Sequence, residues 1–399
     1  MYRDVDFLSL ESELTDDERQ IRDIVRSFVD REFLPQACEY YEQGQFPTHL
    51  ITKMAQIGLF GANLTGYDLP GIGNVAYGLA LQELERGDSA LRSFVSVQSA
   101  LCMYPIWAFG SEEQQRHWLP RLAGGAAVAC FGLTEAGFGS NPAGLQTTAR
   151  PSADGTGWIV SGSKMWITNG TMAQVAIIWA KADGRVQGFL VETDRPGFHA
   201  VAQKYKLSMR ISDTAELFLD DVEIPRENHL PGATDLKHAL MCLDQARFGI
   251  AWGVIGAAAH CYETALNYGR TRIVFDQPIN RYQLYQEKLH YMIREISLMQ
   301  LLALRLGRLK DAGTLHHTQT SLAKQNNVEK ALAIARLARE MLGANGISGE
   351  YPVMRHLCNL ETVYTYEGTN DIHKLIVGQA VTGLAAFTVG QEDTSSGHP

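Results

Sequence analysis

The chain has 399 residues, of which 45% are hydrophobic and 20% are charged, so it can bury a large core spread over two or three domains. Its formal net charge is -9, and no basic block is present to neutralise phosphates, which argues against general nucleic-acid binding. The six cysteines stand singly, which argues against a zinc site and against a disulfide framework, so no metal is expected.

The acidic start of the chain lacks a long apolar run. We therefore expect neither a signal peptide nor an arginine-rich transit peptide there. No window approaches the length of a membrane span. Together these features predict a cytoplasmic protein without a membrane partner.

Residues 14–130 have a helical pattern. Thr15, followed by acids, begins a helix that ends near Pro35. Residues 74–110 are expected to form two helices. Ser111, again followed by acids, begins another.

Residues 131–235 have a different texture, typical of a compact antiparallel β domain. The segments are short, rich in β-branched and aromatic residues, and separated by Gly, Asp and Pro. They read GWIVSGSKMWITNG, AQVAIIWAKA, VQGFLVET, GFHAVAQ and AELFLDDVEIP.

Helical periodicity returns from residue 239. Apolar residues from Leu289 to Leu306 recur every three or four positions, which indicates a helix packed in a bundle, and a later helix is stopped by Gly343. The absence of βαβα alternation argues against a Rossmann site. The layout predicts an α+β protein with an N-terminal helical domain, a middle β domain, a C-terminal helical domain and a polar, disordered tail, over residues 1–130, 131–238, 239–390 and 391–399.

Glu367 stands in the sequence YEGTND, just ahead of a predicted helix capped by Thr369 or Asn370. The helix dipole favours the carboxylate anion, whereas burial beside Tyr366 would raise the pKa of Glu367 toward a value useful to a base. A surface or capping glutamate explains the same pattern.

Two segments at the junction of helix and sheet offer amides, hydroxyls and an aromatic face. They are CFGLTEAGFGSNPAG, residues 130–144, and MWITNG, residues 165–170. Such groups can hold a planar ring with polar edges, although ordinary β-turns explain either segment singly.

Charged residues on apolar helices form two further candidate sites. If residues 83–99 are one helix, Glu85, Arg92 and Ser96 lie within about 40° of one another and could bind a carboxylate. An exposed ion-pair face is the alternative. Further on, three arginines stand within otherwise apolar helical segments and can pair with phosphates or with acids. They are Arg247, Arg272 and Arg281.

In this order and at these separations, the segments resemble the acyl-CoA dehydrogenase family, most of all its glutaryl-CoA branch, from about residue 15 to 387. The specific segments are FGLTE, WITN, RSFVSVQS, ARFGIAWG, MLGANGIS and HLCNLETVYTYEGTNDIH. Position 367 matches the catalytic glutamate of most members, while Ala246 stands where the isovaleryl and long-chain branches carry theirs. Asn370, Asn141 and Asp276 depart from the usual pattern.

The resemblance implies a fold of two helical domains around a β domain, the C-terminal one a four-helix bundle. It also implies FAD as cofactor and a homotetramer. The implied substrate contacts are Glu85, Arg92, Ser96, Val97, Ser140, Leu243, Arg247, Tyr366 and Gly368. The implied FAD contacts at the β domain are Phe131, Leu133, Thr134, Gly139, Ser140, Trp166, Ile167 and Thr168. Those reaching FAD across a subunit contact or near the base are Arg272, Phe275, Gln283, Glu340, Leu342, Gly343, Gly346, Thr369 and Asp371.

The chemistry that the resemblance implies is α,β-dehydrogenation of glutaryl-CoA, with decarboxylation to crotonyl-CoA and an electron-transfer flavoprotein as acceptor. A related dehydrogenase acting on another short acyl-CoA or acyl-carrier-protein thioester, without decarboxylation, is an alternative. A flavin oxidase of the same fold is a further alternative, but it would carry Asp in place of Glu367. A non-catalytic helical assembly protein would lack flavin absorbance near ~450 nm.

Overall fold

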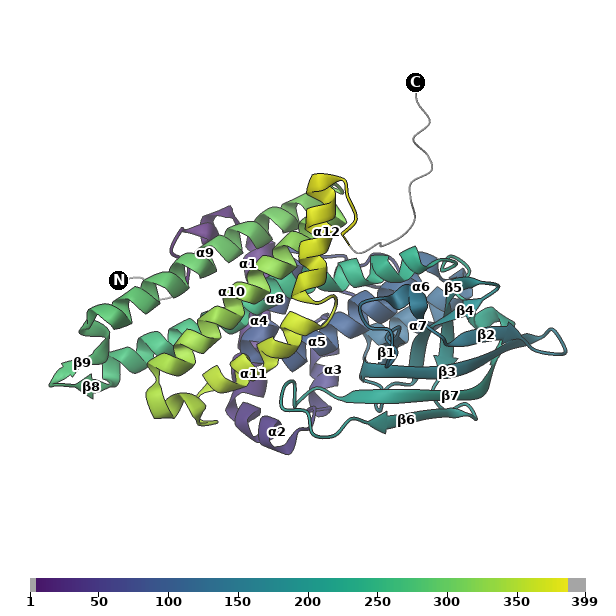
Figure 1. Cartoon of the computed structure of the whole chain (residues 1–399), viewed down its shortest axis with the longest axis horizontal. Helices are drawn as coiled ribbons and strands as arrows, with labels where there is room; N and C mark the ends of the chain where they lie inside the picture. The colour runs from purple at the N-terminus through teal and green to yellow at the C-terminus, as the bar shows by residue number, and fades with distance from the viewer. Residues whose placement is uncertain (1–4, 387–399) are drawn as a thin grey trace, which may run out of the picture.

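The computed structural model describes residues 5–386 and consists of helices, then a sheet, then helices (Figure 1). The predicted tail at 391–399 lies outside the described residues. Within residues 5–386 no helix is both long enough and apolar enough to span a bilayer. All six cysteines are free thiols.

The N-terminal helices begin where capping side chains occur. Thr15 Oγ1 accepts a hydrogen bond from the Glu18 amide, and the Glu18 carboxylate accepts one from the Thr15 amide. Ser111 and Gln114 form the same reciprocal cap. The α-helices are α1 (Asp16–Phe28), α2 (Ala37–Gln43), α3 (His49–Gln56), α4 (Asn74–Gly87), α5 (Ser89–Ser96), α6 (Tyr104–Phe109) and α7 (Glu112–Ala123).

Asp88 divides the predicted helical stretch 74–110 into two runs, as expected. It is extended, with φ -164°, and its side chain caps α5 by accepting the Ala90 amide. The second run continues from α5 through the π-helical turns Val97–Met103 into α6.

A seven-stranded sheet occupies the middle of the chain, in the order β1-β4-β2-β3-β7-β6, with β5 paired to β4. Most neighbours are antiparallel, but β1 runs parallel to β4, and β2 meets β4 in parallel. Nearly all of β4 is buried, as its continuous apolar sequence indicates. The strands are β1 (Ala129–Gly132), β2 (Thr148–Pro151), β3 (Gly157–Thr168), β4 (Val175–Ala182), β5 (Arg185–Glu192), β6 (Phe198–Ala202) and β7 (Thr214–Pro225).

Long helices make up the C-terminal part, where α8, α9 and α10 run side by side (Figure 1). The predicted stripe is largely buried, with Met292, Ile296 and Met299 on α9 fully enclosed. Gly343 follows α10 with φ +59°, so the predicted stop is confirmed. The helices are α8 (Leu236–Thr271), α9 (Gln283–Asp311), α10 (His317–Met341), α11 (Pro352–Thr365) and α12 (Asn370–Thr382). A short hairpin that the sequence analysis did not predict, β8 (Ile273–Val274) and β9 (Gln277–Pro278), joins α8 to α9.

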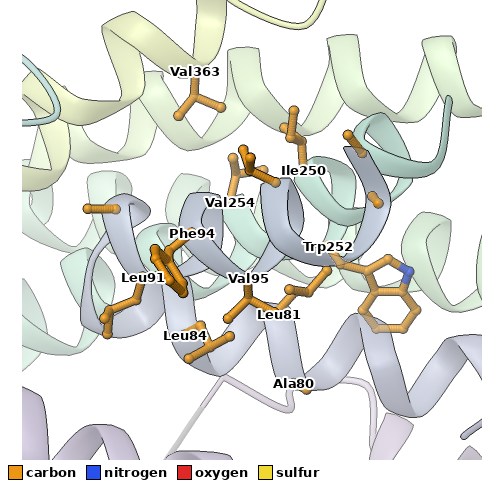
Figure 2. Packing of buried hydrophobic residues seen from close by; sticks show 14 of the residues in the cluster. Ala80, Leu81, Leu84, Leu91, Phe94, Val95, Ile250, Trp252, Val254 and Val363 are labelled. Carbon is orange, nitrogen blue, oxygen red and sulfur yellow. The ribbon is translucent and has the colours of Figure 1, made fainter. Parts of the chain in front are cut away.

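The two helical parts share one core. Figure 2 shows Leu81 and Leu84 of α4, Phe94 and Val95 of α5, and Ile250 and Val254 of α8 packed together, with Val363 of α11 above them. Helices α4 and α8 touch closely at Gly256, because a Cβ there would lie 1.9 Å from the carbonyl oxygen of Gln82. This contact fixes α4 against α8, the helix that also carries Arg247.

Candidate active site

Glu367 lies in the turn between α11 and α12. Both Glu367, with φ +56°, and Gly368, with φ +89°, adopt left-handed backbone conformations. Thr369 Oγ1 then caps α12 by accepting the Ile372 amide at 3.2 Å. Of the two caps that the sequence allows, Thr369 is the one used.

Three helices hold the backbone of this turn. Arg247 Nε, from α8, donates to the carbonyl oxygen of Glu367 at 2.8 Å, and His373 Nε2, from α12, lies 3.2 Å from the same oxygen. Lys324 Nζ, from α10, donates to the carbonyl oxygens of Tyr366 and Gly368 at 3.1 and 2.9 Å. The turn is therefore fixed on both sides of the carboxylate.

The Glu367 carboxylate has the surroundings expected of a general base. Its Oε2 atom is buried and has no hydrogen-bond partner among the described residues. Burial raises the pKa of Glu367, while Arg247, Arg92 and Lys324 act in the opposite direction and lower it. A buried carboxylate with a raised pKa and an unused oxygen can accept a proton from a bound molecule.

Arg92 and Glu85 form a buried ion pair that contacts the partly buried Tyr366, the residue before Glu367. Arg92 Nε donates to Glu85 Oε2 at 2.7 Å, and Arg92 Nη2 donates to the Tyr366 hydroxyl oxygen. Burial disfavours the charge on Arg92, but Glu85 and Tyr366 together outweigh it and raise the pKa of Arg92. The same burial raises the pKa of Tyr366 to about 12, so its hydroxyl stays neutral.

The prediction from spacing that Glu85 and Arg92 lie close together is confirmed, but the two residues do not belong to one helix. Glu85 lies in the last turn of α4 and Arg92 lies on α5, on either side of the break at Asp88. The pair is buried rather than exposed, so the exposed ion-pair alternative is also wrong. Glycine at position 253 of α8 leaves space for the Glu85 side chain, because a Cβ there would lie 2.2 Å from Glu85 Oε2.

The remaining predicted substrate contacts are spread over helices, the turn before α12 and a loop of the β domain. Ser96, which ends α5, and Val97, which begins the π-helical turns, are buried, and a Cβ built at Gly249 of α8 would lie 3.8 Å from Ser96 Oγ. Leu243 is partly buried one turn before Arg247. Ser140 is exposed on the loop after β1.

The two segments predicted to hold a planar ring come together at the edge of the sheet. The Met165 amide donates to the carbonyl oxygen of Thr134 at 2.9 Å. Trp166 follows at an irregularity in β3, with φ +64° and 62% of its surface exposed. Phe131, Leu133 and Ile167 are buried beneath, Thr134 and Thr168 are partly buried, and Gly139 is exposed.

This arrangement fits one face of a flavin. The exposed indole of Trp166 offers a flat apolar face on which a ring could stack, and a Cβ built at Gly139 would meet nothing within 4 Å. Buried Lys164 pairs with Glu135 at 2.8 Å, and Thr147 Oγ1 donates to the same carboxylate, which fixes the backbone beside Thr134.

The predicted FAD contacts on the β8–β9 hairpin and just after α10 lie at the end of the helical part that points away from the sheet (Figure 1). Phe275 at the tip of the β8–β9 hairpin is 86% exposed, and Arg272 and Gln283 are also exposed. A cavity of about 290 Å³ lies there, lined by Phe275, Tyr285, Lys288, Glu340 and Met341 among others, away from Glu367. Leu342 and Gly346 are buried, and Gly343 is exposed. One chain therefore does not bring the two predicted sets together.

Two predicted contacts near the base have other partners in the structure. Thr369 caps α12, and Asp371 is exposed and pairs with Lys374 at 3.2 Å. Among residues 5–386, no group of three His, Cys, Asp or Glu side chains could hold a metal ion.

Sequence reasoning missed Lys324 and His373. Lys324 lies between Ser321 and Val328 on the buried stripe of α10, and this helical phase was the signal that could have found it. It also missed Asp88, which pairs with Arg355 of α11 and accepts from Asn359 Nδ2 at 3.0 Å. These contacts link the start of α5 to α11, the helix that Tyr366 directly follows.

Comparison with known proteins identifies relatives along the chain. Residues 15–126, 130–222 and 236–382 match the family models for the N-terminal, middle and C-terminal domains of acyl-CoA dehydrogenases. Among solved structures, glutaryl-CoA dehydrogenase from Mycobacterium smegmatis is 53% identical with a TM-score of 0.95, covering 97% of this chain and 100% of that one.

Two further relatives extend the comparison. A glutaryl-CoA dehydrogenase from Mycobacterium smegmatis in complex with FADH2 is 49% identical with a TM-score of 0.96, covering 97% of this chain and 100% of that one. The mitochondrial short-chain specific acyl-CoA dehydrogenase of Bos taurus is 33% identical over 374 residues, which are 92% of this chain and 90% of the bovine protein.

Proposed function

The chain belongs to the acyl-CoA dehydrogenase family of FAD-dependent oxidoreductases, and we propose that it oxidises glutaryl-CoA and decarboxylates the product to crotonyl-CoA. The observation that carries this proposal is the buried Arg92 bound to Tyr366, the residue that precedes Glu367. A guanidinium so close to the base can bind the terminal carboxylate of a short dicarboxylic acyl chain while the α carbon lies at Glu367.

Glu367 removes the proton from the α carbon of the thioester. This C–H is too weakly acidic to react without stabilisation of the enolate, for which the Glu367 backbone N–H would donate to the thioester carbonyl. FAD, when bound beside Trp166, supplies the acceptor for the hydride from the β carbon. The buried core of α4, α5 and α8 excludes water from one side of the reacting carbons.

Decarboxylation needs the same two residues. Arg92 orients the carboxylate of glutaconyl-CoA, whose bond to the γ carbon then breaks. The electron pair of that bond passes into a dienolate conjugated with the thioester, and carbon dioxide leaves. Glu367, protonated in the first step, returns its proton to the γ carbon and gives crotonyl-CoA.

The assembly and partners follow from the same proposal. Arg247 and Leu243 would contact the CoA part of the substrate. The hairpin at Phe275 and the loop at Gly343 would reach the flavin of a neighbouring subunit in a homotetramer. An electron-transfer flavoprotein would reoxidise the flavin.

The test of this proposal compares two substrates in an Arg92→Gln variant. We expect kcat/KM for glutaryl-CoA to fall roughly 10- to 100-fold more than kcat/KM for butyryl-CoA, because only glutaryl-CoA loses a charge-assisted contact. Arg86→Gln is the matched control, since Arg86 is also buried but pairs with Glu83 and Asp30. Equal losses on both substrates in the Arg92 variant would refute a carboxylate-binding role.

A further inference from the structure

Lys324 is buried under the turn that carries Glu367. Its Nζ donates to the carbonyl oxygen of Tyr366 at 3.1 Å and to that of Gly368 at 2.9 Å. These two carbonyl groups flank Glu367, and Arg247 Nε donates to the carbonyl oxygen of Glu367 itself at 2.8 Å. Three successive carbonyls are thus bound by two cationic side chains from α8 and α10.

The backbone held in this way is strained. Glu367 is a non-glycine residue with φ +56°, a conformation that side chains with a Cβ rarely adopt. Such a residue keeps its conformation only where the surrounding contacts enforce it. Without a donor on the two flanking carbonyls, the turn can relax toward ordinary φ values and move the carboxylate.

The environment of Lys324 gives it no other evident role. Within residues 5–386 it makes no ion pair, whereas the equally buried Lys164 pairs with Glu135 at 2.8 Å. Burial lowers the pKa of Lys324 to about 7, although nearby Glu367 raises it. A buried amine without a carboxylate partner is costly, so its retention under this turn requires a compensating contact.

We propose that Lys324 is a positioning residue that holds the left-handed turn of Glu367 through the Tyr366 and Gly368 carbonyls and so aims the carboxylate at the substrate α carbon. This inference rests on the proposed role of Glu367 as the base. It assigns Lys324 no contact with substrate or flavin.

The experiment measures proton removal separately from hydride transfer. The probe is 3-thiaglutaryl-CoA, in which sulfur replaces the β carbon, so that the α proton can be removed but no β hydride exists. Exchange of the α protons in D2O is followed by mass spectrometry, and affinity for the same compound is measured by calorimetry, using FAD-loaded enzyme.

In Lys324→Met we expect α-proton exchange to fall by roughly 100-fold, because a displaced base loses alignment, while the affinity for the probe stays unchanged. Lys324→Gln keeps one N–H donor group and is expected to recover part of the rate. Lys206→Met is the matched control, since Lys206 also donates to two backbone carbonyls, those of Met209 and Ser212, in the β domain. The Lys206→Met variant is expected to exchange the α protons of the probe at the wild-type rate.

Wild-type exchange in Lys324→Met would overturn the proposal. So would a parallel loss of exchange, affinity and FAD content, because that pattern describes general damage to the site. Absence of exchange in the wild-type enzyme would instead refute the role of Glu367 itself. If Lys324→Met does not fold, Lys324→Gln decides alone: a reduced exchange rate at unchanged affinity supports the proposal, and the wild-type rate overturns it.

Discussion

At position 367, burial and neighbouring charges act on one carboxylate in opposite directions. Burial raises the pKa of Glu367, and Arg247, Arg92 and Lys324 lower it without abolishing the rise. The carboxylate therefore remains basic enough to take a proton and still ionises in a usable range of pH.

The raised pKa predicts how the first step depends on pH. Glu367 acts only when ionised, so the rate of flavin bleaching by substrate in a single turnover should rise with pH and level off above the pKa of Glu367. The inflection should lie above 4.5, the ordinary value for a glutamate. Tyr366, with a pKa of about 12, contributes no step in this range.

Glu367→Gln is the control for this profile. It should slow bleaching by about 10²- to 10⁴-fold and remove the rise attributed to Glu367, while leaving the titration of groups such as Lys324 in place. A wild-type inflection at or below pH 4.5, or a profile that Glu367→Gln leaves unchanged, would contradict the assignment.

Contacts between single residues could be predicted from the sequence only where the two residues are close together in the chain. Glu85 and Arg92 are seven positions apart, and their contact survives the helix break at Asp88 because α4 and α5 stay adjacent. Lys324 is far from position 367 in sequence, and only the packing of α10 on the turn brings them together. Neither the left-handed φ of Glu367 nor this contact has a signature in the residues around it.

Elements were predicted best where side chains mark their ends. Thr15, Ser111 and Gly343 mark helix ends directly, and the structure places the ends there. The β8–β9 hairpin was missed because each strand has only two residues, too few for alternation to show. The parallel pairing of β1 with β4 was missed because pairing partners are set by tertiary contacts.

The close packing of α4 on α8 gives a prediction about stability. In Gly256→Ala the new methyl group would meet the carbonyl oxygen of Gln82 at 1.9 Å, which is backbone and cannot rotate away. We expect the free energy of unfolding to fall by about 1–3 kcal/mol in urea titrations of FAD-loaded protein.

Gly378→Ala on α12 is the matched control for Gly256→Ala. A Cβ at Gly378 would meet nothing within 4 Å, so the helix should gain about 0.5–1 kcal/mol. Equal effects of both substitutions would contradict the packing described for α4 and α8.

For the whole molecule, the separation of the two predicted sets of FAD contacts is the main consequence of the fold. Trp166 belongs to β3 of the sheet, whereas Phe275 belongs to the β8–β9 hairpin, which Figure 1 shows at the tip of the helical part that points away from the sheet. We infer that a complete flavin site requires a second copy, which the sequence resemblance suggested and a single chain cannot display.

Phe275→Ser tests this inference. Removing an aromatic ring that is 86% exposed should leave the monomer folded yet reduce both the oligomeric mass, by light scattering, and the bound FAD, by absorbance near ~450 nm. Tyr205→Ser is the control, because Tyr205 is 95% exposed at φ +65° but lies in a loop of the β domain. Full FAD content and unchanged mass in Phe275→Ser would refute the shared site.

The most direct measurement of the central claim is the identity of the product formed from glutaryl-CoA. Purified enzyme with an artificial electron acceptor is incubated with glutaryl-CoA, and the thioesters and carbon dioxide are quantified by mass spectrometry. A glutaryl-CoA dehydrogenase built around Glu367 and Arg92 should release crotonyl-CoA and carbon dioxide in equal amounts. Accumulation of glutaconyl-CoA without carbon dioxide, or oxidation of butyryl-CoA with glutaryl-CoA left untouched, would contradict it.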